Sequence, residues 1–527
     1  MKRSEFLKAV AASAGAATFG LPHLARAQAP GLRAGIKLTP TSLDPHFRLS
    51  GEQAILRAMH ARLVGMTADG KPEPGIAESW RPIGDNTVWE FKIRADAKFS
   101  DGSPITAEDV AYSIARVPTI TGSAGAYHIF VRAITGTEVK DARTLHIRTA
   151  QPYPFMAEDM TEIAVLSKSL GAGLRTADFN AKEVRVFSGP YTLTDYRFGE
   201  FIEMRRNPHW TGAAPAFETA NFKVISSDAS RMAALIAGDV QAVDEVSIPD
   251  IPRLRRDANL NVTQTAGMRV MYVAMDMDRD ASPFVRDAAG QPMTRNPLKD
   301  ARVRQALSLA LNRQAIVERV MEGAATVASN LLPEGTPGTS ANLRVVQQDV
   351  ARARALLVEA GYPNGFQLTI HATNDRYPND EKVAQAIAQF WTRIGVRTEV
   401  ATLPNAAYFP AASRQTFSVM AAQYGADNVS YAYRALVHTF DRERGLGTAN
   451  RTRHSSPRAD ALVAQALTEM DDAKRNGLLA QAADIAIGED AIIHMVYHPA
   501  YVYAARKPLS VTPYYNGAFL PQAVTRG

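Results

Sequence analysis

The chain has 527 residues, 46% of them hydrophobic, and this much apolar material fills several cores, so we expect more than one globular domain. The formal net charge of +6 is too small for the basic surface of a nucleic-acid-binding protein. No cysteine is present, which excludes disulfides, thiolate metal sites and cysteine nucleophiles.

The N-terminal segment has the pattern of a secretory signal peptide. Its positive charges come from Lys2, Arg3 and Lys8. Residues 9–21 are small or apolar and uncharged, and residues 25–29 provide small side chains at the spacing that a signal peptidase requires. We expect cleavage after Ala27 or Ala29, because the apolar run is too short to span a membrane.

Export of this kind predicts a periplasmic protein of a Gram-negative cell. Ser4 stands where a twin-arginine motif has its second arginine, so both the folded and the unfolded export routes remain open. Lipid anchoring of the lipoprotein type requires a cysteine and is therefore excluded. No later stretch reaches about 18 consecutive apolar residues, so we expect no other membrane span.

The first part of the mature chain is predicted to be rich in strands. Residues 89–93 alternate apolar and polar side chains, which indicates a half-buried strand. Thr106 and Asp109 have the spacing of a capping box, which predicts that a helix begins there. We expect a helix at 52–63 and further strands at 32–38, 144–148, 191–196, 201–205 and 221–225.

Helices and strands alternate from residue 228 onward. Apolar residues within 303–311 recur with the i, i+3, i+4, i+7 and i+8 spacing of a helix. The loop 278–297 is rich in Asp, Arg, Gly and Pro, and we expect it at the surface. Further helices are predicted at 228–238, 349–360 and 380–394, and strands at 270–275, 396–401 and 492–497. This alternation is typical of α/β lobes with partly parallel sheets.

Motifs for cofactors and catalysis are absent from the sequence. Residues 65–71 fit the G-x-x-x-x-G-K spacing of a phosphate-binding loop, but Pro72 follows where that loop needs Ser or Thr. Pro72 and Pro74 also oppose the helix that would hold the phosphates, so we interpret the segment as a surface turn. No dinucleotide-type glycine motif, G-x-S-x-G elbow or H-E-x-x-H occurs. We expect no cofactor and no catalytic residue.

Two histidines have a spacing that can indicate a metal site. His494 and His498 are four residues apart, as two zinc ligands on one helix are. We place them on the strand predicted at 492–497, where this spacing separates two side chains by about 13 Å. That is too far for both to bind one ion, so we predict no metal site.

A series of short blocks runs in order along nearly the whole mature chain. They are 43–45 (LDP), 77–80 (AESW), 89–94 (WEFKIR), 99–102 (FSDG), 106–110 (TAEDV), 188–191 (SGPY), 206–210 (RNPHW), 301–307 (ARVRQAL), 360–363 (AGYP) and 383–387 (VAQAI). In this order they resemble family 5 of the bacterial extracellular solute-binding proteins, which includes dipeptide, oligopeptide, glutathione, opine and nickel receptors. The resemblance is specific for the family and not for the ligand.

The resemblance implies an α/β fold, mixed in α and β, of the bilobal periplasmic-binding-protein-like type II with an extra domain in the first lobe. The signal peptide would be 1–29, and domain I would comprise 30–50, 186–270 and 490–527. Domain II would be 51–185 and domain III, the second lobe, 271–489. The ligand would lie between lobes that close about a hinge. The four aromatic residues of the blocks are expected to form one core: Trp80, Trp89, Phe91 and Phe99.

The function implied is that of a periplasmic substrate-binding component of an ABC importer. Its partners would be a small peptide or peptide-like solute and the permease subunits in the inner membrane, and we expect a monomer. Two alternatives remain. One is a receptor for a non-peptide solute such as an opine or a metal chelate, and the other is a periplasmic hydrolase.

The resemblance also implies where a ligand would be held. In dipeptide-type members an aspartate shortly after an aromatic residue receives the peptide's amino group, and Asp427 occupies that place, with Tyr424 before it and Asn428 after it. The alternative is that Asp427 and Asn428 only begin a turn. Arg376 would meet a carboxylate through its planar guanidinium, unless it is an exposed loop charge. Ser50 lies in a loop that lines the cleft in some members.

Overall fold

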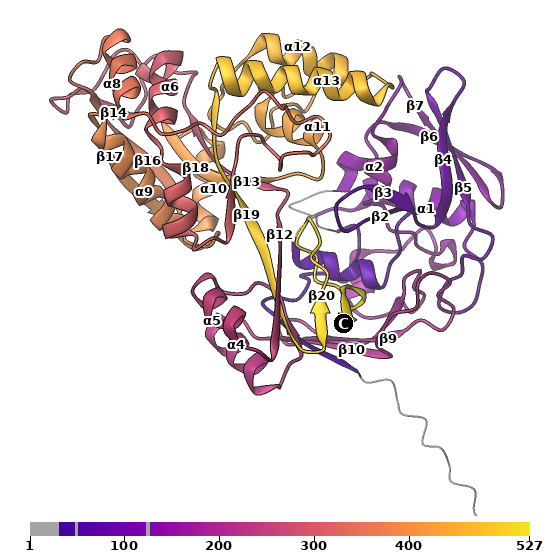
Figure 1. Cartoon of the computed structure of the whole chain (residues 1–527). Helices are drawn as coiled ribbons and strands as arrows, with labels where there is room; N and C mark the ends of the chain where they lie inside the picture. Colours follow the sequence, from indigo (N-terminus) through magenta and orange to yellow (C-terminus); the bar gives the residue numbers. More distant parts are fainter. Residues whose placement is uncertain (1–30, 48–50, 123–126) are drawn as a thin grey trace, which may run out of the picture.

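The computed structural model describes residues 31–47, 51–122 and 127–527. The predicted signal peptide and Ser50 therefore lie outside the described residues. The described chain forms two α/β lobes, and the first lobe carries an additional small domain (Figure 1). This arrangement confirms the predicted fold class. Among the described residues, no helix is both long and apolar enough to cross a membrane.

A mixed sheet of 13 strands extends through both lobes. Its main path is β14-β16-β18-β13-β19-β11-β1-β10-β9-β8, while β12 and β15 pair with β19 and β17 pairs with β16. The strands on the first-lobe side are β1 Leu32–Ile36, β8 Tyr191–Arg197, β9 Phe201–Arg206, β10 Thr219–Val224, β11 Ala242–Val243 and β12 Leu260–Ala266. Those on the second-lobe side are β13 Arg269–Met275, β14 Val285–Arg286, β15 Ala325–Val327, β16 Phe366–Thr373, β17 Val396–Leu403 and β18 Val419–Gly425.

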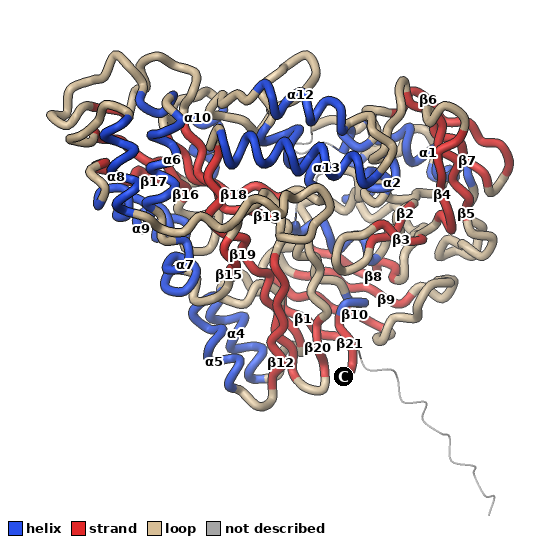
Figure 2. The backbone as a smooth tube through the Cα atoms, turned by 45° about the horizontal axis from the view of Figure 1, so that its top comes forward, coloured by secondary structure: helices blue, strands red, loops and turns tan. Residues whose placement is uncertain are grey.

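The long strand β19, Ile493–Arg506, connects the two lobes (Figure 2). Its first half pairs with β13 and β15, and its second half pairs with β12 and β11. Beside it β12 passes into β13 through Gly267, whose amide donates to the carbonyl of Pro499 at 2.8 Å. A Cβ added at Gly267 would lie 2.8 Å from that carbonyl oxygen, so no side chain fits at this crossing.

The small domain of the first lobe is built on an antiparallel sheet. Its strand order is β4-β5-β7-β6, and its strands are β4 Ala77–Ile83, β5 Val88–Ile93, β6 Ile134–Asp141 and β7 Thr144–Thr149. A separate hairpin pairs β2 Val64–Met66 with β3 Pro72–Pro74. Trp89, Phe91 and Phe99 are buried in one core as predicted, whereas Trp80 is only half-buried beside it.

Helix α1, Ala107–Arg116, begins at the predicted capping box. The amide and the hydroxyl of Thr106 both donate to the Asp109 carboxylate at 2.8 Å. The other first-lobe helices are α2 Met156–Met160, α3 Thr176–Asn180, α4 Asp228–Ala237 and α5 Ile251–Arg256. Strands β20 Leu509–Val511 and β21 Val524–Arg526 form a short hairpin near the end of the chain.

Helices cover the sheet of the second lobe (Figure 1). They are α6 Ala301–Ala310, α7 Arg313–Ala315, α8 Val350–Glu359, α9 Asp380–Arg393, α10 Asn405–Ser413, α11 Val429–Ala432, α12 Pro457–Ala466 and α13 Asp472–Ala483. Helix α6 packs against α8 and α9, and the buried indole of Trp391 donates to the carbonyl of Leu307 at 2.9 Å. A buried indole needs such an acceptor, and this bond fixes α9 on α6.

Short 3-10 and π helices fill several connections. The 3-10 helices are η1 Gly51–Ala58, η2 Val117–Thr119, η3 Tyr127–Phe130, η4 Lys168–Leu170, η5 Ile248–Asp250, η6 Pro297–Lys299 and η10 Pro521–Ala523. The π helices are η7 Ile316–Val320, η8 Tyr433–Val437 and η9 Asp484–Glu489.

Two element predictions were wrong in extent. The helix expected at 52–63 is the 3-10 helix η1, which ends at Ala58. The segment after it pairs with residues 163–165 instead, because the Leu63 amide donates to the carbonyl of Ile163 and the Val165 amide donates to the carbonyl of Ala61. The strand expected at 492–497 continues through Pro499 to Arg506. Proline's missing N–H is tolerated there because β19 exchanges its partners β13 and β15 for β12 at that point.

Candidate ligand-binding site between the lobes

A pocket lies between the two lobes and has about 410 Å³ of empty space, its opening to solvent included. Its first-lobe residues are Met66, Gly70, Pro72, Phe130, Glu158, Asp159, Thr161 and Glu162. Its second-lobe residues are Asp427, Asn428, Tyr431 and Arg434.

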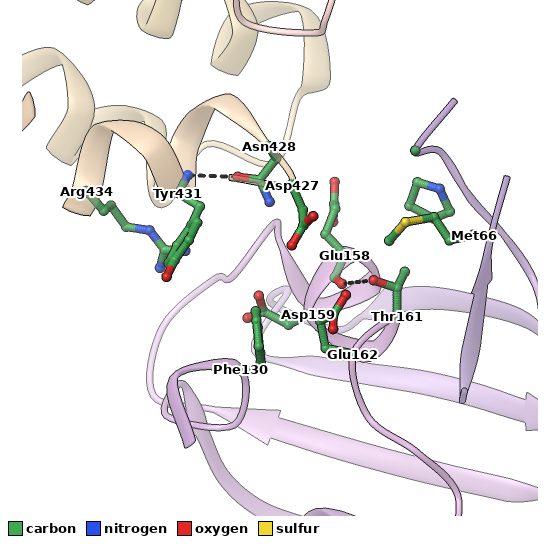
Figure 3. A pocket seen from close by; sticks show the side chains of 12 residues that line it. Met66, Phe130, Glu158, Asp159, Thr161, Glu162, Asp427, Asn428, Tyr431 and Arg434 are labelled. Atoms are coloured by element: carbon green, nitrogen blue, oxygen red, sulfur yellow. Dashed lines mark hydrogen bonds between the residues drawn. The ribbon is translucent and has the colours of Figure 1, made fainter. Parts of the chain in front are cut away.

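The second-lobe wall is built where β18 passes into α11. Asn428 caps this helix, since its side-chain oxygen accepts from the Tyr431 amide at 2.7 Å (Figure 3). The cap fixes the backbone just before the helix, and the Asp427 side chain points from there toward the first lobe. The predicted turn and the predicted cleft position of Asp427 are thus both present.

Few protein groups stabilise the negative charge of the Asp427 carboxylate. The Tyr515 hydroxyl lies 3.1 Å from Asp427 Oδ1 and donates to it. Among the described residues, no basic side chain forms an ion pair with Asp427. Burial in the cleft, together with the nearby negative charge of Glu162, raises the pKa of Asp427 to about 6, although Arg57 and Tyr515 act in the opposite direction.

Tyr515 reaches this place because the β2–β3 hairpin holds it. The Tyr515 amide donates to the carbonyl of Ala68 at 2.9 Å, and its own carbonyl accepts from Met268 at 3.0 Å. Gly70 has φ +87°, and a Cβ there would lie 3.2 Å from the Tyr515 ring. The glycine-rich turn at 65–71 therefore does more than form a surface turn: it makes room for Tyr515 and lines the pocket.

The first-lobe wall is acidic and comes from α2 and the turn after it. The Tyr153 hydroxyl donates to Asp159 Oδ2 at 2.5 Å, and Arg57 forms an ion pair with Glu162. Burial raises the pKa of Asp159 to about 7 and also raises that of Glu158. Removal of these carboxylates from water disfavours their charged forms.

Aromatic rings hold the guanidinium of Arg434 at the other side of the pocket. It lies 5.7 Å from the ring centroid of Phe155 in the first lobe and 6.0 Å from that of Tyr431. Arg475 of α13 lies over the same Phe155 ring at 5.3 Å. Leu467 and Met470 pack on the core of the small domain, so the lobes touch directly beside the pocket.

The remaining residues predicted for the site do not line this pocket. The Tyr424 ring is half-buried and lies 6.3 Å from the ring of Tyr431, which does line it. Arg376 is exposed, and its guanidinium lies over Tyr377 at 5.8 Å. Ser50 lies outside the described residues.

Sequence reasoning missed the acidic wall, Arg434 and Tyr515. A signal was available for the wall: Glu158, Asp159 and Glu162 are the acidic residues in an otherwise apolar stretch, 152–166. Acidic side chains inside such a stretch are carried into a buried surface, where an isolated charge is costly. Arg434 and Tyr515 had no comparable signal, because the fold alone brings them to the pocket.

No group of three or more possible metal ligands gathers among the described residues. His494 and His498 lie on β19, as expected, and both are buried. The ring of His498 bonds through Nδ1 to the carbonyl of Arg269 at 2.9 Å. None of the described residues that line the pocket is a histidine.

Comparison with known proteins identifies the family to which this chain belongs. Residues 71–442 match the family described as bacterial extracellular solute-binding proteins, family 5 Middle. The chain belongs to this family. It is 25% identical over 470 residues to the probable D,D-dipeptide-binding periplasmic protein DdpA of Escherichia coli strain K12, with 86% of each chain covered. It is 26% identical to the dipeptide-binding protein of that strain over 395 residues, 69% of this chain and 70% of the other.

The structure also agrees with solved members of this fold. It superposes on HbpA2 from Haemophilus parasuis with a TM-score of 0.80 and 22% identity, covering 94% of this chain and 100% of the other. The family-5 chain thus has the bilobal receptor architecture, and its interlobe pocket lies where the family resemblance implied a ligand.

Proposed function

We propose that this protein is the periplasmic substrate-binding component of an ABC importer and captures a small peptide or peptide-like solute between its lobes. Family membership supports the receptor role. One observation carries the ligand class: Asp427 faces the interlobe pocket without an ion-pair partner among the described residues. A buried carboxylate of this kind is suited to a primary ammonium group, which supplies both the charge and the hydrogen-bond donors.

Arg434 is the better candidate for the solute's carboxylate. It lines the same pocket as Asp427, whereas Arg376 is exposed and outside it. The rings of Phe155 and Tyr431 hold the Arg434 guanidinium in place, so little freedom is lost on binding. Asp427 and Arg434 then match the two ends of a zwitterion. Tyr424 would support the site through Tyr431, and Asn428 through its helix cap.

The amine contact is tested with Asp427→Asn, which keeps the size of the side chain. Calorimetric titration with Ala-Ala should show a loss of about 2–5 kcal/mol, because the ammonium loses its counter-charge. This is a weakening of Kd by roughly 30-fold or more. N-acetyl-Ala-Ala, which lacks the amine, should bind both proteins equally weakly.

Asp280→Asn serves as the matched control, since that carboxylate is 93% exposed and pairs only with Lys299. It should bind Ala-Ala as the parent does. Equal binding of Ala-Ala by the parent and by Asp427→Asn would refute the amine contact. Native mass spectrometry of freshly purified protein would identify a co-purified solute directly.

The alternatives fit the pocket less well. Opines carry additional carboxylates, which the acidic first-lobe wall disfavours. A metal chelate would need histidine contacts, and none of the described residues that line the pocket is a histidine. A hydrolase with a serine or cysteine nucleophile needs a base beside it, and the described residues that line the pocket include no serine, cysteine or histidine. We propose binding without turnover; release of products from peptides incubated with the protein would contradict this.

The remaining parts of the proposal concern export and assembly. The protein would be exported with cleavage after Ala27 or Ala29, act as a monomer and deliver its solute to permease subunits. N-terminal sequencing of the periplasmic protein tests the cleavage; retention of Met1 would contradict it. The proposed domains are 30–50 with 186–270 and 490–527, 51–185, and 271–489. A hydrophobic core whose buried residues all lie within 63–165 supports the second of these domains, and the paired crossings at Gly267 and Pro499 support the boundary between the first and the third.

A further inference from the structure

The charges of the pocket do not balance. Four carboxylates line it: Glu158, Asp159, Glu162 and Asp427. Three guanidinium groups oppose their charge: Arg434 in the lining, Arg57 paired with Glu162, and the buried Arg62, on which Glu162 also acts. A neutral zwitterion placed between Asp427 and Arg434 leaves this negative excess unchanged. Burial of unpaired negative charge is costly, so the excess needs an explanation.

Glu162 carries an open acceptor inside the pocket. Its side chain is 3% exposed, and Arg57 bonds to Oε1 alone. The other oxygen, Oε2, is buried and has no hydrogen-bond partner among the described residues. Buried polar atoms almost always have a partner. An acceptor left open in a pocket wall is therefore suited to a donor from the solute.

Glu158 provides a second carboxylate on the same wall. Its main-chain carbonyl accepts from the Thr161 hydroxyl at 2.7 Å. Its side chain lines the pocket (Figure 3). No ion pair with Glu158 forms among the described residues. Burial raises its pKa, with Arg475 and Asp472 acting on it in opposite directions.

We infer that the solute has a positive net charge and that its second cationic group, the ammonium or guanidinium of a basic side chain, binds to Glu158 and Glu162 of the first lobe. This rests on the proposed function and sets its substrate class. The amine at Asp427 and the second cation then contact carboxylates of opposite lobes. Because these carboxylates face one another across the cleft, the cationic solute also relieves their repulsion when the lobes close.

The inference is tested by titration with three dipeptides that share a free amine and a free carboxylate: Ala-Lys, Ala-norleucine and Ala-Glu. Norleucine keeps most of the length of lysine without its charge. Ala-Lys should bind at least about tenfold more tightly than Ala-norleucine, and Ala-Glu should bind most weakly. Added salt should reduce the difference less than it would at an exposed site, since the second cation is enclosed.

Two variants locate the second cation. Glu158→Gln and Glu162→Gln keep the size of each side chain, and each should remove most of the preference for Ala-Lys over Ala-norleucine. Thermal melts check that Glu162→Gln, which also gives up the ion pair with Arg57, still folds. Glu108→Gln is the matched control, because Glu108 is exposed in the same domain and pairs with Lys168. It should keep the full preference.

The outcomes separate this inference from the proposed function. If Ala-Lys and Ala-norleucine bind equally, the second cationic site is refuted and the peptide receptor stands. If 1,5-diaminopentane binds and no dipeptide does, the cationic class is supported and the peptide part of the proposed function falls. If Glu108→Gln alters the preference as much as Glu158→Gln, the assignment to the pocket wall is wrong.

Discussion

Two acidic residues of this protein, the buried Asp44 and the half-buried Asp427, have opposite surroundings. Asp44, in the first lobe, is fully buried and forms two bonds with Arg116, at 2.9 and 2.6 Å. It also accepts from the His46 amide at 3.0 Å and from the Thr176 hydroxyl at 2.7 Å. Asp427, between the lobes, accepts one bond from Tyr515 and forms no ion pair among the described residues.

The comparison shows how to separate scaffold from site within one chain. Every face of the Asp44 carboxylate is used by the protein itself, so its charge serves the fold. In the pocket, Glu162 keeps an acceptor without a partner among the described residues, and burial raises the pKa values of Asp159 and Asp427, so we interpret these carboxylates as groups that bind a solute. The following predictions test this contrast, from the largest expected effect to the smallest.

Asp44→Ala should lower the free energy of unfolding by about 3–5 kcal/mol, because Arg116 then remains buried without its partner. Urea denaturation followed by circular dichroism measures the effect. A loss below about 1 kcal/mol would mean that the pair is not part of the scaffold.

Asp159→Asn should stabilise the unliganded protein increasingly as the pH rises. The pKa of Asp159 is raised from about 4 in the unfolded chain to about 7 in the fold. Its favourable contribution is thus complete below pH 4 or so and is lost as the pH rises through about 7. The stability difference between variant and parent should grow by about 1–3 kcal/mol between pH 5 and pH 8. The groups that face Asp159 are Tyr153, Arg434, Glu158 and Glu162.

The parent alone cannot show this effect, because buried histidines act with the opposite sign. Burial lowers the pKa values of these residues: His46, His60, His371, His454, His494 and His498. Their contribution is present above the unfolded value of about 6.5 and is lost as the pH falls. The difference between variant and parent cancels this background. A flat difference would contradict the raised pKa of Asp159.

Asp427→Asn should leave the free energy of unfolding unchanged or raise it by up to about 3 kcal/mol at pH 7, although it weakens binding of the amine. The variant removes a charge that burial disfavours, while its amide oxygen still accepts from Tyr515. Thermal melts without solute measure this. A fall comparable with that of Asp44→Ala would place Asp427 in the scaffold.

Arg197→Gln should change the free energy of unfolding by less than about 0.5 kcal/mol. Arg197 pairs with Glu200 at 2.9 Å, but both side chains are more than half exposed. Water and salt screen such a pair. This variant, measured in the same urea series, sets the lower end of the comparison.

The sequence was sufficient for the fold class, the family and two residues of the pocket lining, Asp427 and Asn428. The block of residues 89–94 and the capping box at Thr106 report local structure, which short patterns encode directly. Asp427 was found because its neighbourhood resembles one family segment. The extent of β19 was missed, since Pro499 is tolerated only where the sheet exchanges partners.

The acidic wall and Arg434 were not predicted because they form the pocket only across the lobe boundary. Glu162 and Asp427 are 265 positions apart in the chain, and their charges act on one another only in the folded protein. Arg376 was proposed from the family resemblance alone, whereas Arg434 is the arginine that lines the pocket. Patterns within one segment carry no information about such juxtapositions.

Strand β19 has a consequence for the order in which the protein folds. It begins at Ile493, yet it lies between β13 and β11 in the centre of the large sheet, and β11 in turn pairs with β1 near the start of the described chain. Neither half of the sheet can be completed until almost the whole chain has been made. Contacts between such distant segments form slowly, so the newly synthesised chain remains open until its last forty residues or so are available to join the two lobes.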